Sequence, residues 1–543
     1  MSLSTIDLVV VIIYAIGIFS LAQFVSREKA GHEKDTSDYF LASKNLPWWA
    51  IGASLIAANI SAEQIVGMSG SGYAIGLAIA SYEWMAALTL LIVGKFFLPI
   101  FLKNHIYTMP QFLDRRYGKV LPIIMALFWL ALYVFVNLTS IIWLGSIAVN
   151  KVAGIDQNIA LIILGAFALL YQIRGGLKAV ALTDIVQVTL LVLGGLVVAY
   201  LTLTKIGNGD VFAGFHALVT ASPDHFHMIL KKGDPHYIDL PGLSVLIGGM
   251  WIANIAYWGF NQYIIQRALA AKSLDEAQRG VIFAAFLKLL MPVIIVLPGI
   301  AAVVLAPGLL KPDEAYPTMM RLLPPGLLGL VFAALVAAIV ASTASKINSI
   351  ATIFTLDLYA KFFRGEKTRA EDDRAESASE EKHLVLVGRI TAIAAIIVAI
   401  IMARPLLGKS EQAFQYIQEF SGFFTPGITV IFLLGLFWKR ATEWGAIVAA
   451  VTSVGLSAIM KRALPAPEFS QGLNDYLTPF INRMGVVFLV SLVLAIVVSL
   501  VTPQRPDVDT IDTASVRYKT SAGFNAGALG VVLILIALYS TWW

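Results

Sequence analysis

Apolar segments long enough to cross a lipid bilayer recur along the whole of this chain. A membrane-spanning α-helix needs about 20 consecutive, mostly apolar residues, and such segments repeat from residue 6 to the last residue, Trp543. Hydrophobic residues make up 58% of the composition and charged residues 13%, whereas a soluble protein has about 25% charged residues. The sequence therefore predicts an all-α polytopic membrane protein whose surroundings are the lipid bilayer.

The apolar pattern fits about fourteen transmembrane helices. The expected spans are residues 6–26, 47–71, 77–102, 120–149, 157–173, 179–204, 241–266, 280–306, 326–359, 384–403, 411–438, 442–460, 482–502 and 523–543. No basic region precedes the first span and no small-residue cleavage site follows it, so we expect a retained helix and not a signal peptide. An even number of spans places both termini on one side of the membrane.

Lys and Arg are unevenly distributed between alternate loops. Most of the 39 basic residues lie in the loops that follow the odd-numbered spans. The positive-inside rule assigns these loops to the cytoplasm, which predicts that both termini lie outside. Because topology accounts for the net charge of +5, no nucleic-acid partner is expected.

Two loops are long. Residues 363–382 are mixed in charge and poor in large apolar groups, so we expect a mobile cytoplasmic linker without catalytic function. Residues 205–240 are expected on the outer side as a solvated loop, and the histidines of that loop are His216, His225, His227 and His236. Their spacing does not match the ligand sets of structural metal sites, so no metal is expected there.

The sequence lacks the motifs of the common enzyme and channel classes. It has no cysteine, which excludes disulfides and thiolate metal sites. It has no HExxH, GxSxG or Walker-type pattern, and no selectivity-filter motif of a channel is visible. A transporter is therefore favoured, and an enzyme is not expected.

Polar residues and glycines gather in the second span, ASLIAANISAEQIVGMSGSGYAIG. These residues are Asn59, Ser61, Glu63, Gln64, Gly67, Gly70 and Gly72. Polar groups and helix breakers at the middle of a membrane favour a discontinuous helix with free backbone carbonyls and amides. The alternative is that the glycines only allow close helix packing.

The span at 241–266 has a comparable polar face. Asn254, Tyr257, Trp258 and Asn261 lie at offsets 0, 3, 4 and 7, which places them on one side of a helix. Aromatic rings could cover the apolar face of a sugar or polyol while amides bind its hydroxyl groups. The alternative is an aromatic girdle or simple packing.

Several other polar side chains lie within predicted spans, where their cost makes each a candidate functional group. They are Glu83, Asn137, Asp184, Lys288, Gln415 and Gln418. Glu83 and Lys288 could neutralise each other or contact a ligand. In the span at 326–359, Ser342, Ser345 and Ser349 lie on one face, where their hydroxyls could bind a small cation or a backbone carbonyl.

The order of the spans predicts an inverted repeat. Residues 47–204 and 241–438 each contain five spans, and an odd number forces the second block into the opposite orientation. The interrupted span opens each block, as in secondary transporters that bind substrate at the midplane. Segment 6–26 is then an extra helix before this core and 442–543 contains three helices after it, all within one transporter domain, 1–543.

The sequence resembles the solute:sodium symporter family, and within it the bacterial sodium/galactose cotransporters. The resemblance lies in NISAEQIVGMSGSGYAIG, SYEW, YVFVNLTS, GFNQYIIQRALAAKS, AAFLKL and QAFQYIQE. It implies a LeuT-like 5+5 core that couples Na⁺ to the uptake of a galactose- or glucose-like hexose by alternating access, in the bacterial inner membrane. An amino acid, carboxylate or nucleobase, coupled to sodium or protons, is the alternative.

The resemblance also implies roles for single residues. The implied sugar contacts are Gln64, Glu83, Asn254, Tyr257, Lys288 and Gln418, with Tyr257 stacking on the sugar as an inner gate. The implied gate and cavity residues are Met68, Tyr82, Tyr133, Asn137, Trp258 and Phe414. The implied sodium ligands are the carbonyls of Ala57, Ile60 and Ala338 and the hydroxyl of Ser342. Asp184 is implied on the ion path, and Ser345 in a second sodium site.

Two positions depart from the family pattern. Ala86 stands where a serine contacts sugar, and Ala341 stands where a second hydroxyl often completes the sodium site. Because one oxygen ligand fewer weakens the binding of a hard cation, Ala341 makes proton coupling a more plausible alternative.

Overall fold

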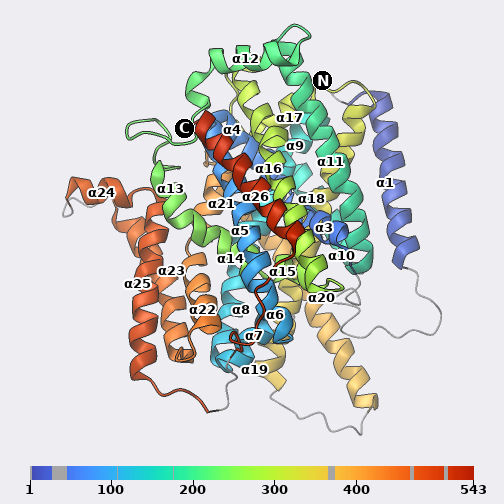
Figure 1. Cartoon of the computed structure of the whole chain (residues 1–543). Helices are drawn as coiled ribbons and strands as arrows, with labels where there is room; N and C mark the ends of the chain where they lie inside the picture. The colour runs from blue at the N-terminus through green and yellow to red at the C-terminus, as the bar shows by residue number, and fades with distance from the viewer. Residues whose placement is uncertain are drawn as a thin grey trace.

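The computed structural model describes residues 3–26, 46–106, 108–174, 177–364, 374–464, 470–506 and 511–543. These residues form an all-helical bundle in which most helices run along one direction (Figure 1). Over the described ranges there is no β-strand, only an isolated bridge between Leu46 and Ala271. The prediction of an all-α fold is therefore confirmed.

The first half of the chain contains the following elements, where η marks π- or 3₁₀-helical turns. They are α1 (Thr5–Ser26), α3 (Trp48–Asn59), η2 (Glu63–Met68), α4 (Ser69–Ala74), η3 (Leu77–Ala80), α5 (Ser81–Ile92), η4 (Val93–Phe97), α6 (Leu98–Lys103), α7 (Met109–Arg116), α8 (Val120–Ala131), η5 (Leu132–Leu138), α9 (Thr139–Ala153), α10 (Gln157–Arg174), α11 (Leu177–Ile206), α12 (Val211–Ala221) and η6 (Pro223–His225).

The second half continues the bundle. Its elements are α13 (Leu243–Ile247), α14 (Gly249–Phe260), α15 (Gln262–Leu269), α16 (Leu274–Leu305), η7 (Pro312–Glu314), α17 (Ala315–Met320), α18 (Leu327–Thr352), η8 (Ile353–Tyr359), α19 (Ala360–Arg364), α20 (Arg374–Leu407), α21 (Ala413–Ser421), α22 (Thr425–Phe437), α23 (Glu443–Ala463), α24 (Gln471–Leu477), α25 (Phe480–Val501) and α26 (Ala522–Thr541).

The described helices are suited to a bilayer. Nine are long and apolar enough to cross it, or up to eleven if each of two bent pairs forms one span. The periphery of the bundle exposes large apolar side chains, such as Ile162 and Val493, as expected where lipid replaces water. A polytopic membrane protein is thus supported, and the count of fourteen spans stays a prediction.

The second predicted span is broken. Helix α3 ends at Asn59, Ile60 has an extended backbone (φ −71°, ψ 112°), and α3 makes an angle of 67° with the segment Glu63–Ala74. The predicted discontinuity is confirmed, although the break precedes the glycines. The glycines permit close packing instead, since a Cβ on Gly70 would lie 2.5 Å from the Asp313 side chain.

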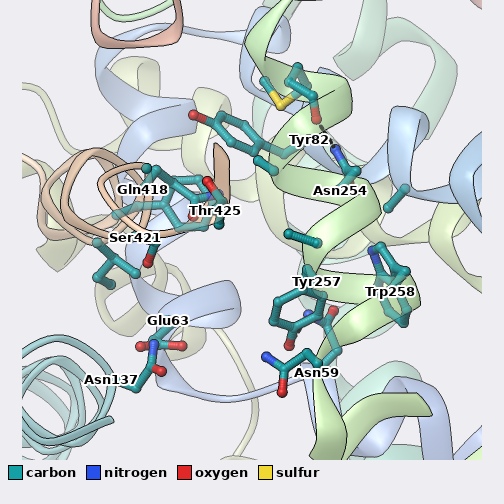
Figure 2. Close-up of a pocket in the computed structure, with 18 of the residues that line it drawn as sticks. Asn59, Glu63, Tyr82, Asn137, Asn254, Tyr257, Trp258, Gln418, Ser421 and Thr425 are labelled. Atoms are coloured by element: carbon teal, nitrogen blue, oxygen red, sulfur yellow. Dashed lines mark hydrogen bonds between the residues drawn. The ribbon is translucent and has the colours of Figure 1, made fainter. Parts of the chain in front are cut away.

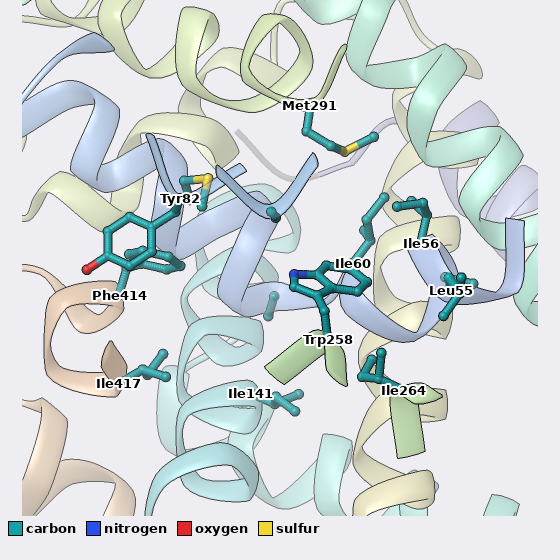
Figure 3. Packing of buried hydrophobic residues seen from close by; sticks show 14 of the residues in the cluster. Leu55, Ile56, Ile60, Tyr82, Ile141, Trp258, Ile264, Met291, Phe414 and Ile417 are labelled. Atoms are coloured by element: carbon teal, nitrogen blue, oxygen red, sulfur yellow. The ribbon is translucent and has the colours of Figure 1, made fainter. Parts of the chain in front are cut away.

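The chain is interrupted again between α14 and α15. Asn261 lies between these helices with an extended backbone (φ −85°, ψ 118°), so the predicted irregularity of the span at 241–266 is confirmed. The helices α21 and α22 form a second bent pair, with an angle of 43°. Around these breaks, apolar side chains such as Ile56, Ile60, Ile141 and Met291 fill the interior (Figure 3).

The predicted loops differ from the structure in two places. Residues 205–240 contain a helix, α12, whose first turn is capped by the Asp210 side chain accepting from the N–H of Ala213. Aromatic contacts between Phe226 and Trp542 pack the segment after α12 against the C-terminal end (Figure 1). Helix α20 begins at Arg374, inside the predicted linker, and residues 365–373 lie outside the described ranges. Among described residues, no group of three His, Asp or Glu could hold a metal.

Candidate functional site

The breaks in the helices border a cavity of about 120 Å³, several times the roughly 10–15 Å³ that one water needs. Elements η2, α5, α14, α16 and α21 contribute to its wall. The predicted site residues that line it are Gln64, Met68, Tyr82, Glu83, Asn137, Asn254, Tyr257, Trp258, Lys288, Phe414 and Gln418. Residues far apart in sequence are thus brought together, and we call this space the large cavity.

Aromatic rings stand at two ends of the large cavity. Tyr82 packs edge-on against Phe414, with ring centroids 5.1 Å apart. Figure 2 shows Tyr257 and Trp258 at the other end, below Tyr82. This arrangement leaves the amides of Gln418 and Asn254 on opposite sides of the space between the rings (Figure 2).

The hydroxyl of Tyr257 is held at the broken end of α3. It accepts a hydrogen bond from Nδ2 of Asn59 at 3.1 Å and shares a second, of 2.6 Å, with the hydroxyl of Tyr263. The side-chain amide of Asn59 is thus a partner of this hydroxyl. Tyr257 therefore links α14 to the interrupted segment of the second span.

Glu83 and Lys288 form a buried ion pair. Nζ of Lys288 lies 2.5 Å from Oε2 of Glu83, and both side chains are almost wholly buried. Lys288 also donates to the Asn59 side-chain oxygen and lies 5.1 Å from the ring centroid of Trp258. The two side chains thus neutralise each other. Because both residues also line the large cavity, they can contact a ligand at the same time.

Some polar atoms around the large cavity lack partners. The hydroxyls of Tyr82 and Thr425 are buried and make no hydrogen bond with any residue in the described ranges. Nδ2 of Asn254 donates to the carbonyl of Met250 at 3.0 Å, which leaves its side-chain oxygen to accept. Because buried polar groups are normally paired, these atoms suit a solute that carries hydroxyl groups.

A second cavity, of about 20 Å³, lies beside the first and holds about one water-sized particle. We call it the small cavity. The residues of the predicted sodium site that line it are Ala57, Ser342 and Ser345. Ile60 and Ala338 are buried but do not line it, and the Asp184 side chain lies outside what the structure describes. Hydroxyl and carbonyl oxygens are the ligands that hard cations prefer.

The sequence of the chain matches a known family and curated relatives over most of its length. A model of the sodium:solute symporter family matches residues 39–453. The chain belongs to the sodium:solute symporter family. Among curated relatives of this symporter, "Sodium/glucose cotransporter" of Vibrio parahaemolyticus is 48% identical and the alignment covers 100% of this chain and 99% of that protein. "Sodium/myo-inositol cotransporter 2" of Bos taurus is 33% identical over 83% of this chain and 69% of that protein.

Solved structures show a related fold. A Na⁺-coupled sialic acid symporter in a substrate-bound outward-open state superposes with a TM-score of 0.72 and 21% identity, covering 92% of this chain and 99% of that one. A nucleobase-cation-symport-1 family transporter gives a TM-score of 0.53 at 13% identity, covering 90% and 100%. These likenesses show that the symporter has a LeuT-like transporter fold.

One predicted cavity residue lies elsewhere. Tyr133 does not line the large cavity, and its hydroxyl donates instead to Oδ1 of Asn261 at 3.2 Å. Asn261 itself lines that cavity, so Tyr133 supports a wall residue. Tyr133 thus contacts the interrupted end of α14, and its predicted role as a cavity residue stays a prediction.

The site roles drawn from the family resemblance omitted residues that join the two cavities. Asn59 and Glu63 line both, and Oε1 of Glu63 accepts from the hydroxyl of Ser140 at 2.5 Å. Lys346 and Arg267 line the small cavity. The sequence held a signal for two of these residues, because Glu63 and Lys346 are charged side chains within predicted spans.

Asp313 is a buried carboxyl in η7 that contacts two other parts of the bundle. Its Oδ2 accepts a hydrogen bond from the N–H of Ala413 at 3.1 Å, and its other oxygen packs close to Gly70 of α4. Burial, the largest influence, raises the pKa of the Asp313 carboxyl to about 7. The carboxyl therefore keeps its proton under conditions where an exposed one would lose it.

We expect Asp313 to make the unsubstituted (parent) symporter less stable as the pH rises toward 7. In the unfolded chain, Asp313 loses its proton near its ordinary pKa of about 4. Between that value and about 7, the folded form binds one proton more, so raising the pH destabilises it by up to about 4 kcal/mol. Thermal unfolding of the parent and of Asp313→Asn between about pH 5 and 8 checks this. The stability of the variant should depend much less on pH. An equal pH dependence of stability in both proteins would contradict the prediction.

Proposed function

We propose that this symporter couples Na⁺ to the import of a galactose- or glucose-like hexose by alternating access. The observation that carries the proposal is the pair of cavities: a polar, aromatic one with unpartnered hydroxyls lies beside a small, oxygen-lined one, and Asn59 and Glu63 line both. The names of two relatives support it, since glucose and myo-inositol are both polyhydroxylated rings.

The residues of the large cavity have distinct proposed roles. The amides of Gln64, Asn254 and Gln418 bind sugar hydroxyls together with the Glu83–Lys288 pair. Tyr257 stacks on the sugar ring and closes its inner exit, while Met68, Tyr82 and Phe414 cover it from outside. Asn137 and Trp258 complete the wall.

In the small cavity, sodium is held by oxygen ligands from two helices. We assign to it the hydroxyl of Ser342 and the carbonyl of Ala57, with Ile60 and Ala338 contributing carbonyls when the ion binds. Because α3 ends at Asn59, an ion at this position stabilises the end that also holds Tyr257 and Lys288. Sodium binding therefore organises the sugar site, which is the physical basis of coupling.

The proposal includes the arrangement in the membrane. Fourteen spans place both termini outside the bacterial inner membrane, and residues 47–204 and 241–438 form inverted repeats. One helix precedes this core and three follow it. In support, the interrupted helices α3 and α14 open the two blocks, and both ends of the described chain lie toward the end of the bundle that α12 covers (Figure 1).

Uptake into proteoliposomes tests this function. Labelled galactose, glucose and myo-inositol should accumulate under an inward sodium gradient, and much less when choline replaces sodium. Deoxy-sugars should bind less well by about 1 to 3 kcal/mol for each missing hydroxyl. Transport of an amino acid, carboxylate or nucleobase with hexoses ignored would reject the sugar assignment, and uptake driven by a proton gradient alone would reject sodium coupling.

We expect Ser342→Ala to weaken sodium-driven uptake severely. Ala341, the neighbouring residue that also lines the small cavity, has no hydroxyl, so it cannot supply the oxygen that the variant removes. The half-saturating sodium concentration should rise about tenfold or more, which corresponds to roughly 1.4 kcal/mol. Measuring uptake as a function of sodium concentration gives the half-saturating concentration of each protein.

Ser349→Ala is the matched control for this prediction. It lies on the same helix, but its hydroxyl donates to the backbone oxygen of Ser345 at 3.0 Å and does not line the small cavity. Its sodium dependence should equal that of the parent. If Ser342→Ala also kept the parent's sodium dependence, Ser342 would not be a sodium ligand.

A further inference from the structure

Lys346 is a buried cation without a polar partner in the described structure. It lies on α18 directly after Ser345, is 7% exposed and lines the small cavity. Its ammonium makes no hydrogen bond and no ion pair with any residue that the structure describes. A lysine ammonium carries three donors, and burying it without compensation is costly, so this position requires an explanation.

The surroundings of Lys346 compensate its charge at a distance. Its Nζ lies 3.5 Å from the ring centroid of Tyr263 and 4.8 Å from that of Tyr133, where the faces of the rings attract a cation. The carboxylate of Glu63 acts on it electrostatically across the small cavity. Glu63 accepts a hydrogen bond from the hydroxyl of Ser140, and both Glu63 and Lys346 line the small cavity without a hydrogen bond between them in the described structure.

Arg267 also borders the small cavity, but it is bound differently. Its Nη1 donates to the hydroxyl of Ser54 at 2.6 Å, and its Nε donates to the carbonyl of Tyr263 at 3.2 Å. The guanidinium is thus bound to the neighbouring helix α3 and to the backbone of its own helix, α15. Lys346 is the cation whose ammonium is left to the cavity itself.

We propose that Lys346 is a resident cation of the small cavity, which occupies the place of a second sodium opposite Glu63 and limits the cavity to one transported ion. The inference rests on the proposed function, because it assumes that sodium binds beside Ser342. It revises the role that the family resemblance implied for Ser345, since the ammonium of the next residue competes for the second position.

Replacing Lys346 by a neutral side chain should strengthen sodium binding. A positive charge within one small cavity repels the incoming ion, and removing it should lower the half-saturating sodium concentration about tenfold or more. Lys346→Met keeps most of the length of the side chain and removes the charge. Lys346→Ser also opens space and adds an oxygen, so that variant should bind two sodium ions per chain where the parent binds one.

The experiment measures sodium binding directly on the purified full-length symporter. Binding of ²²Na⁺ and sodium-dependent thermal stabilisation are recorded at constant ionic strength, with choline as the replacement cation. Lys346→Gln is measured beside Lys346→Met, so that a folding defect in one variant does not decide the result. Lys346→Arg keeps the charge and should stay close to the parent, and Lys232→Met removes an exposed lysine and should change nothing.

Two results would overturn the inference. One is a parent symporter that binds two sodium ions, and the other is a pair of variants, Lys346→Met and Lys346→Gln, with the sodium affinity of the parent. Neither affects the proposed function, which is tested separately by sodium-driven sugar uptake in the parent. Conversely, loss of sodium-driven sugar uptake in the parent would reject the function whatever the variants bind.

Discussion

Lys288→Met is expected to reduce sugar uptake by at least about a hundredfold. The change removes the ammonium that lies 2.5 Å from the Glu83 carboxylate and leaves that carboxylate buried and unpaired. Removing one partner of a buried ion pair costs about 3–5 kcal/mol. Asn59 loses a donor at the same time, so the end of α3 is disturbed together with the sugar site. Initial rates of uptake and thermal unfolding measure the two consequences.

The double variant Glu83→Gln with Lys288→Met separates neutralisation from ligand binding. With both charges gone, no unpaired charge is buried, so thermal stability should recover in large part. Sugar uptake should stay low if the pair also binds hydroxyls. Arg279→Met, which breaks an exposed ion pair with Asp275, controls for the loss of a positive charge. It should lower the free energy of unfolding by less than about 1 kcal/mol. Parental uptake by the double variant would show that the pair is structural only.

The breaks in the helices were predictable from sequence because they have a local cause. Amides, hydroxyls and glycines within a span weaken the helix or need partners, and both predicted interruptions occur in the structure, at Ile60 and Asn261. The polar face with Tyr257 was predictable for the same reason, since helical periodicity alone places these residues on one side. All of its predicted members line the large cavity.

Features that depend on tertiary contacts were not predictable in this way. Whether Lys288 meets Glu83 is decided by how α16 packs against α5, which no local pattern contains. The same holds for Lys346, whose nearest partners, Tyr133 and Tyr263, come from two other elements. Helix α12 was missed because the search was for spans of about 20 apolar residues, and this helix has only 11.

Tyr257→Ala is expected to abolish both sugar binding and uptake, whereas Tyr257→Phe should bind sugar nearly normally and transport it poorly. The ring supplies the stacking surface, which phenylalanine keeps. The hydroxyl joins α14 to Asn59 and Tyr263 through bonds of 3.1 and 2.6 Å, and phenylalanine loses both. Binding to the purified protein and uptake into vesicles must therefore be measured separately for each variant.

Asn59→Ala tests the same connection from its other end. It removes the donor to Tyr257 while leaving the ring and its contact with Tyr263 in place. It also removes the acceptor of Lys288, so its effect should be at least as large as that of Tyr257→Phe. If the hydroxyl bond to Asn59 holds the gate, combining the two changes should lower uptake by less than the sum of their separate effects. Additive losses would contradict that link, and normal binding and uptake by Tyr257→Ala would make Tyr257 an ordinary packing residue.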